Sequence, residues 1–157
     1  MAESRIYREQ EARLKEQLAD LRVQLVAGND FEKGIRQHRL HIIERILCLQ
    51  CPRCQQAFVD FTGVCALECS RCKCSFCAFC LADCGDDEHA HVLACCFNIA
   101  PGRDHFMPIS VFNQVQKERR QRLLGAYFRE RVADEREWHA VRAVIERDLA
   151  DLHMALP

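Results

Sequence analysis

The residues of this chain best suited to chemistry are its cysteines. The 157 residues include 12 cysteines, and all of them lie between Cys48 and Cys96. Six form pairs separated by two residues: Cys51 and Cys54, Cys69 and Cys72, Cys77 and Cys80. A Cys-x2-Cys pair can direct two thiolates at one ion, and structural zinc takes four nitrogen or sulfur ligands. The pairs predict metal binding, because buried thiols without a metal would not need this repeated spacing.

Two further ligands would complete two zinc sites. His91 and Cys95, four residues apart, raise the number of ligands from six to eight. Taken in chain order, the first site is Cys51, Cys54, Cys69 and Cys72, and the second is Cys77, Cys80, His91 and Cys95. Cys84, His89 and Cys96 are alternatives to His91 and Cys95. Both sites would be closed by protein ligands, so the two Zn²⁺ ions are expected to fix the fold and do no chemistry.

The sequence around the cysteines favours a reducing compartment. The first residues, Met1–Arg5, lead into charged sequence without the apolar stretch of a secretory signal peptide. No run of residues is apolar enough for a transmembrane helix. We therefore expect an intracellular protein, cytoplasmic or nuclear, with no membrane partner, in which disulfides are a poor explanation for the cysteines.

The charge pattern favours a protein partner over a nucleic acid. The chain has 22 Lys and Arg against 23 Asp and Glu, and residues 48–98 have 3 basic and 6 acidic side chains. Two zinc ions on seven thiolates would add further negative charge to this segment. Nucleic-acid binding relies on positive charge. An RNA-associated zinc protein that uses Arg119, Arg120 and Arg122 is the least favoured hypothesis, since a run of arginines is usually a solvated helix face.

The elements that must position these ligands divide the chain into three segments. Residues 1–47 predict a helical hairpin, with helices over 3–27 and 31–49 that meet at Gly28 and Asn29, and with Asp30 as the N-cap of the second helix. Leucines at helical spacing give the first helix a short coiled-coil-like stripe: Leu14, Leu18, Leu21 and Leu25.

The last segment, residues 99–157, predicts a linker and a helical pair. Ser110 can cap a helix that runs to about Val132, in which 116–122 is polar on all sides and is expected to be solvated. A second helix begins near Asp134 and has a strong apolar face: Trp138, Val141, Ile145, Leu149 and Leu152. Such amphipathic helices could dock on a protein partner or on a second copy.

The middle segment, residues 48–98, has few large apolar side chains for its length. A region this small needs an additional constraint to hold a fold, and metal can supply it. The fold class is therefore a helical protein built around a small zinc-stabilised module. Among the remaining side chains, Cys74 is expected to point to solvent, Cys48 to end the second helix on its apolar side, and His38 and His41 to lie at the surface.

The cysteine-rich segment resembles a known family. Cys-Pro-Arg-Cys at 51–54, Gly-Val-Cys-Ala-Leu-Glu-Cys at 63–69 and Phe-Cys-Ala-Phe-Cys at 76–80 resemble the in-between-RING and second-RING zinc modules of RING-in-between-RING ubiquitin ligases. The resemblance covers about residues 48–97. It implies a two-zinc module with short β-hairpins, and ubiquitin or a conjugating enzyme as partner.

The family's catalytic cysteine does not fall on a cysteine of this chain. In the family it lies five positions before the third zinc ligand, with a histidine two positions after it. Counted back from Cys69, the position of the catalytic cysteine is Val64 and that of the histidine is Ala66. Cys65 is displaced by one residue, which turns a side chain to the opposite face of an extended segment. The family's first RING also has no counterpart, since no cysteine precedes Cys48. The preferred hypothesis is thus a ubiquitin-linked protein–protein interaction module. The alternative is a ubiquitin transferase in which Cys65 forms the thioester.

Overall fold

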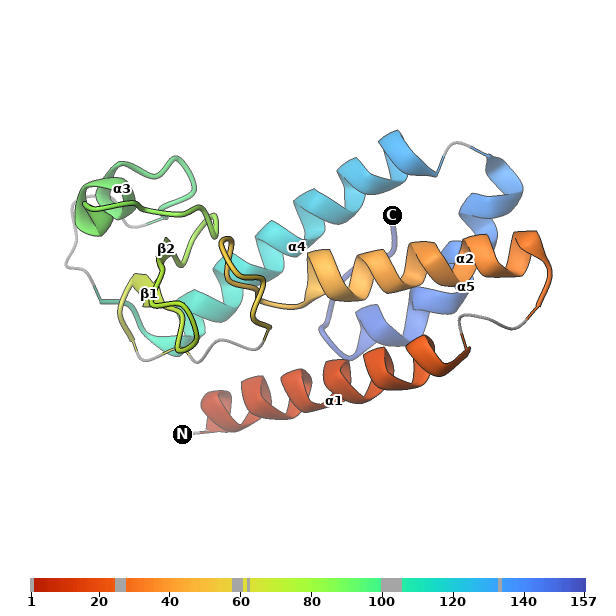
Figure 1. Ribbon diagram of the computed structural model, residues 1–157, viewed down its shortest axis with the longest axis horizontal. Coiled ribbons are helices and arrows are strands. Elements are labelled where there is room, and N and C mark those ends of the chain that lie inside the picture. The colour runs from red at the N-terminus through yellow and green to blue at the C-terminus, as the bar shows by residue number, and fades with distance from the viewer. Residues whose placement is uncertain (1, 25–27, 58–60, 62, 100–105, 133) are drawn as a thin grey trace. The chain divides into compact units, whose positions relative to one another are not determined.

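The chain forms two compact units (Figure 1). The computed structural model describes residues 2–24, 28–57, 61, 63–99, 106–132 and 134–157. Unit 1 comprises Leu49–Arg119 with the described residues before Arg5, and unit 2 comprises Arg5–Cys48 and Arg120–Pro157. The described residues form five α-helices, a π-helical segment and one two-stranded sheet. The expectation of a helical protein with a small cysteine-rich module is confirmed at this level.

Unit 1 contains the small sheet. Strands β1 (Ala66–Glu68) and β2 (Ser75–Cys77) are antiparallel, and Leu67 lies opposite Phe76. Both of these side chains are buried. The unit also contains α3 (Glu88–Ala94) and the first part of α4 (Ile109–Arg131). The strands and α3 are too short to hold a fold without further constraints.

Unit 2 begins with the predicted helical hairpin. Helix α1 (Ala2–Gln24) is followed by α2 (Asp30–His41), which continues as the π-helical segment η1 (Ile42–Leu47). The predicted N-cap Asp30 is wrong by one residue. The Asn29 side chain accepts a hydrogen bond from the Glu32 amide at 2.9 Å, and the Glu32 carboxylate accepts one from the Asn29 amide at 3.4 Å. This reciprocal capping box satisfies two amides at once, so the helix begins at Asp30.

The apolar core of unit 2 is built from the predicted stripes. In the first helix the leucines before Leu25 are buried, and Leu25 itself lies outside the described residues. Helix α5 (Glu135–Ala150) is capped by Asp134, and most of its predicted apolar face is buried. The fully buried side chains contributed by η1 and α5 include Ile42, Ile43, Leu47, Ile145 and Leu149.

The polar stretch 116–122 is not solvated on all sides, which corrects the prediction. Gln116, Arg119 and Arg120 are buried. Within unit 1, Gln116 donates to the Ala78 carbonyl at 2.6 Å and accepts from Arg119 at 2.7 Å. Within unit 2, Arg120 donates to the Leu47 carbonyl at 2.9 Å, at the end of η1. The buried guanidinium groups satisfy acceptors inside the fold, so they do not form an exposed basic face.

His38 is also not a surface residue as predicted. Its Nδ1 lies 2.6 Å from the Tyr127 hydroxyl and its Nε2 lies 2.5 Å from Glu137 Oε1. The ring of His41 stacks on Tyr127, with 4.6 Å between ring centroids. Burial lowers the pKa of His41. Contacts of the two histidines therefore connect α2 with α4 and α5 within unit 2.

A partly buried ion pair links α2 to α5. Arg39 donates from Nε and Nη2 to the two carboxylate oxygens of Asp148, at 3.0 and 3.2 Å. The Asp148 side chain is fully buried. Two parallel hydrogen bonds fix the guanidinium and carboxylate planes relative to each other. No helix in the described ranges is long and apolar enough to cross a membrane.

The substitution Asp148→Asn should destabilise unit 2 by about 1–3 kcal/mol, because it leaves the partly buried Arg39 guanidinium without its counterion. Urea unfolding followed by helical circular dichroism measures the change. The matched control is Glu9→Gln in the exposed Arg5–Glu9 pair, which should change stability by less than about 0.5 kcal/mol. Equal effects of the two substitutions would show that the Arg39–Asp148 ion pair does not stabilise unit 2 more than an exposed pair does.

Candidate metal centre

The structure brings together the residues of both predicted sites. In each set of four, the sulfur or ring-nitrogen ligand atoms all lie within 4.8 Å of one another. Group 1 is Cys51, Cys54, Cys69 and Cys72, and group 2 is Cys77, Cys80, His91 and Cys95. The grouping in chain order is therefore the observed one, and two metal ions could be held.

The distances between ligand atoms suit tetrahedral metal coordination. The Cys51 and Cys72 sulfurs are 3.6 Å apart, and the Cys54 and Cys69 sulfurs are 3.5 Å apart. A tetrahedron with metal–sulfur bonds of about 2.3 Å has edges of about 3.8 Å. A disulfide would need about 2.0 Å between sulfurs, and none of the twelve cysteines forms one.

The three Cys-x2-Cys pairs share one backbone geometry. In each pair the amide of the first cysteine donates to the carbonyl five residues later, at 2.9 Å: Cys51 to Gln56, Cys69 to Cys74 and Cys77 to Ala82. The amide four residues later donates back to the carbonyl of the first cysteine, at 2.8–3.0 Å. The residue at that fourth position is left-handed in all three turns: Gln55, Lys73 and Leu81 have φ of 64°, 62° and 61°. Glycine usually occupies such positions, so the sequence carries no local signal for them.

These turns aim backbone amides at the sulfurs. The Arg53 amide donates to Cys51 Sγ and the Phe79 amide donates to Cys77 Sγ, each at 3.4 Å. Hydrogen bonds from the backbone amides of Cys72 and then Arg71 lower the pKa of Cys69 to about 6. These hydrogen bonds favour the thiolate form of Cys69, which is the form that binds metal. Burial raises the pKa of Cys77, so that thiol needs a cation nearby to ionise.

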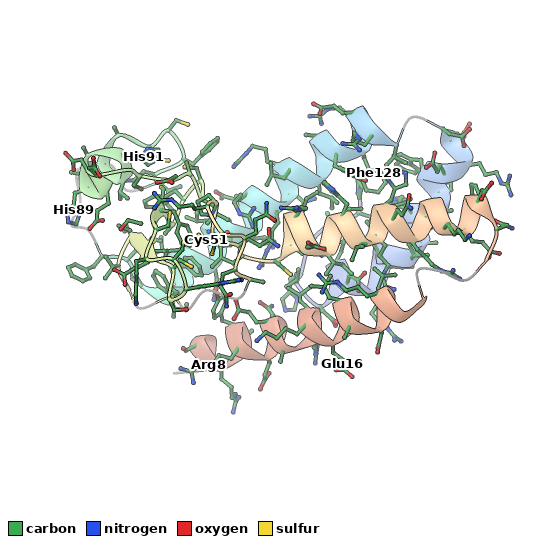
Figure 2. All side chains as sticks on the ribbon, in the orientation of Figure 1. Arg8, Glu16, Cys51, His89, His91 and Phe128 are labelled. Carbon is green, nitrogen blue, oxygen red and sulfur yellow. The ribbon has the colours of Figure 1, made fainter. Side chains whose placement is uncertain are left out.

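Helix α3 and the residue after it supply the last two ligands (Figure 2). The Asp87 side chain caps the start of the helix by accepting from the Ala90 amide at 3.1 Å, and the Asn98 side chain donates to the Val92 carbonyl at 2.9 Å near its end. His91 Nε2 lies 3.3 Å from Cys80 Sγ. The one-turn spacing of His91 and Cys95 thus places both in group 2.

The alternative ligands lie outside the two groups. His89 is exposed, and its Nε2 lies 3.8 Å from a Glu88 carboxylate oxygen. Cys96 is exposed. Cys84 is half-buried, with its sulfur 3.8 Å from the Ala82 carbonyl oxygen. The structure therefore selects His91 and Cys95 from the candidates that the sequence left open.

No family model, curated protein or solved structure matches this chain. The two ligand groups are therefore the features from which a function can be inferred.

The surroundings of Cys65 do not suit a nucleophile. The residue lies just before β1 and is 3 % exposed. Burial raises the pKa of its thiol. A reactive cysteine needs access to its substrate and a stabilised thiolate. The assignment of Cys65 as a thioester-forming residue stays a prediction of the sequence.

Two other cysteines can be placed. Cys74 does not point to solvent as predicted: it is 1 % exposed and its sulfur faces the Ser75 carbonyl at 3.6 Å. Burial raises the pKa of Cys74 to about 12, so it acts as a small buried side chain beside group 1. Cys48 follows η1 and is buried, as the sequence predicts.

The left-handed turns can be tested at Gln55, the exposed residue that directly follows the first pair. Gln55→Gly should leave stability unchanged or raise it by up to about 1 kcal/mol, because glycine adopts positive φ without a steric cost. Gln55→Val should lower stability by about 1–2 kcal/mol. Urea unfolding of the zinc-loaded protein gives both values, with Gln56→Val as the control next to the turn. Gly and Val variants of equal stability would rule out the left-handed conformation.

Proposed function

We propose that this chain is a zinc-binding protein in which two structural zinc ions hold unit 1 as a protein–protein interaction module. The observation that carries the proposal is the presence of two complete sets of four ligands, each within 4.8 Å. Because every ligand in each set comes from the protein, neither ion would keep an open position for a substrate or a catalytic water.

The donor atoms favour zinc. The two groups provide seven sulfurs and one imidazole nitrogen. Thiolates and imidazole are the ligands of structural zinc sites, in which four cysteines, or three cysteines with one histidine, are both common sets. Hard cations such as Mg²⁺ and Ca²⁺ instead select oxygen ligands.

The structural role is supported by the shortness of the elements that carry or adjoin the ligands. The strands β1 and β2 have three residues each and α3 has seven. Isolated helices of this length are marginal in water, and a two-stranded hairpin is too. In such modules the free energy of metal binding is largely the free energy of folding.

Metal removal should unfold unit 1 and leave the helices of unit 2 largely in place. Native mass spectrometry should find two zinc ions per chain, and hydrogen exchange after chelation should show loss of protection within Leu49–Arg119 only. Cys69→Ser should lower the count to one ion, whereas the exposed, non-ligating Cys96 should be replaceable by Ser without loss. A count of one or none in the wild-type chain would overturn the proposal.

The finer proposal is that the partner belongs to the ubiquitin pathway. It is supported by the resemblance of residues 48–97 to the in-between-RING and second-RING modules. The buried thiol of Cys65 favours binding over transfer. Chemical shift changes in unit 1 on addition of ubiquitin or a conjugating enzyme would support this partner, and their absence with both proteins would remove it.

The transferase alternative has its own test. Incubation with a ubiquitin-charged conjugating enzyme should yield no ubiquitin thioester on this chain, because Cys65 is buried and its pKa is raised. Cys65→Ser should therefore behave as the wild type in a non-reducing gel assay. A thioester that forms on the wild type and disappears in Cys65→Ser would show that the protein is an enzyme.

A further inference from the structure

Three exposed apolar side chains lie close together in sequence at the end of α3 and just after it. Leu93, Phe97 and Ile99 are 41 %, 39 % and 51 % exposed, and they lie within seven residues of one another in sequence. We call these three residues the α3 surface. Single exposed apolar residues are normal on soluble proteins, and it is contiguous apolar patches that mark sites of interaction.

Unit 2 shows the ordinary pattern for comparison. Its exposed large apolar side chains include Ile6, Leu123 and Val144, and these lie on three different helices, α1, α4 and α5. Val144 is 40 % exposed, which is almost the value of Leu93. It therefore serves as a matched residue that lies outside the α3 surface.

The sequence beside the α3 surface is acidic. No lysine or arginine occurs from Cys74 to Gly102, whereas four carboxylates precede the surface: Asp83, Asp86, Asp87 and Glu88. Asp83 pairs with Arg53 at 2.9 Å, while Asp86 is exposed at the start of the turn into α3. Three thiolates and one Zn²⁺ in group 2 would add a net charge of about −1. The charge suits a basic partner and opposes binding of phosphates.

The α3 surface depends on group 2 for its position. Cys95, a ligand, lies between Leu93 and Phe97 in sequence, and His91 lies two residues before Leu93. Within α3 itself, Val92 is the buried apolar residue. A helix of seven residues with one buried apolar anchor needs the metal to stay in place.

We infer that the α3 surface binds a protein segment that presents apolar anchors flanked by lysine or arginine, and that it does so only when group 2 holds its metal. The inference rests on the proposed function, because the metal holds α3. The apolar residues of the partner would cover Leu93, Phe97 and Ile99, and its cations would face Asp86 and Glu88.

The test uses the full zinc-loaded chain and two labelled amphipathic helical peptides. One peptide carries leucine on one face and lysine on the other, and its match carries glutamate in place of lysine. Fluorescence anisotropy should show binding of the leucine–lysine peptide and at least about tenfold weaker binding of the leucine–glutamate peptide.

The variants locate the site. Leu93→Ser combined with Ile99→Ser should weaken binding of the leucine–lysine peptide by at least about tenfold, and Asp86→Lys should weaken it and reduce its salt dependence. Val144→Ser should bind as the wild type. His91→Ala should lose both one zinc ion and peptide binding.

The outcomes separate this inference from the zinc proposal. If the wild type holds two zinc ions but Leu93→Ser/Ile99→Ser binds as tightly as Val144→Ser, the α3 surface is not the site. Equal binding of both peptides, or displacement of the peptide by an RNA oligonucleotide, would also overturn the inference. A dimer in analytical ultracentrifugation that dissociates in Leu93→Ser/Ile99→Ser would identify a second copy as the occupant instead. A wild-type count below two zinc ions would instead defeat the proposed function.

Discussion

Four sulfur atoms held a few ångströms apart are unfavourable unless a cation lies between them. In group 1 two of the sulfur pairs lie at 3.5 and 3.6 Å, and thiolates at such distances repel each other strongly in a partly buried place. A divalent ion converts this repulsion into attraction and also satisfies the desolvated charges. The turns, the hairpin and α3 carry or adjoin the ligands of the two groups. With the proposed ions bound, the fold of unit 1 would therefore depend on both of them. The α3 surface inferred above would depend on the ion of group 2 for the same reason.

Unit 2 is stabilised differently. It has an ordinary apolar core, to which η1 contributes four buried side chains. Its polar contacts satisfy specific buried groups, such as the Leu47 carbonyl at the end of η1 and the Asp148 carboxylate on α5. Burial lowers the pKa of Arg120, yet a guanidinium group remains charged at any physiological pH. One chain therefore contains one unit whose stability should follow metal occupancy and one whose stability should not.

The sequence was sufficient to predict the six ligands of the cysteine pairs, because the spacing of those pairs limits which donor atoms can meet. The structure was needed to select His91 and Cys95 from the alternatives. The sequence also predicted α5, because an apolar period of a helix is a direct consequence of burying one face. It could not predict the burial of Gln116 and Arg120. Their partners are the carbonyls of Ala78 and Leu47, which are far away in sequence, and composition alone reports only that the side chains are polar.

The smaller errors have local causes. Asn29 and Asp30 are both good N-caps, and only the reciprocal bond with Glu32 decides between them. Cys74 was predicted to point to solvent because it is not one of the ligands. A free cysteine is, however, among the most often buried side chains. The left-handed turns after the cysteine pairs carry Gln, Lys and Leu instead of glycine, so the backbone there is determined by the hydrogen bonds of the turn and by its ligands.

The proposed function requires two ions, each enclosed by protein sulfur and nitrogen. Zinc-edge X-ray absorption of the purified protein can measure this coordination. Seven sulfurs and one nitrogen shared by two ions predict an average of 3.5 sulfurs and 0.5 nitrogen per zinc, with bond lengths of about 2.3 and 2.0–2.1 Å. A first shell dominated by oxygen or nitrogen, or one with about two sulfurs per zinc, would show that the two groups do not enclose the ions.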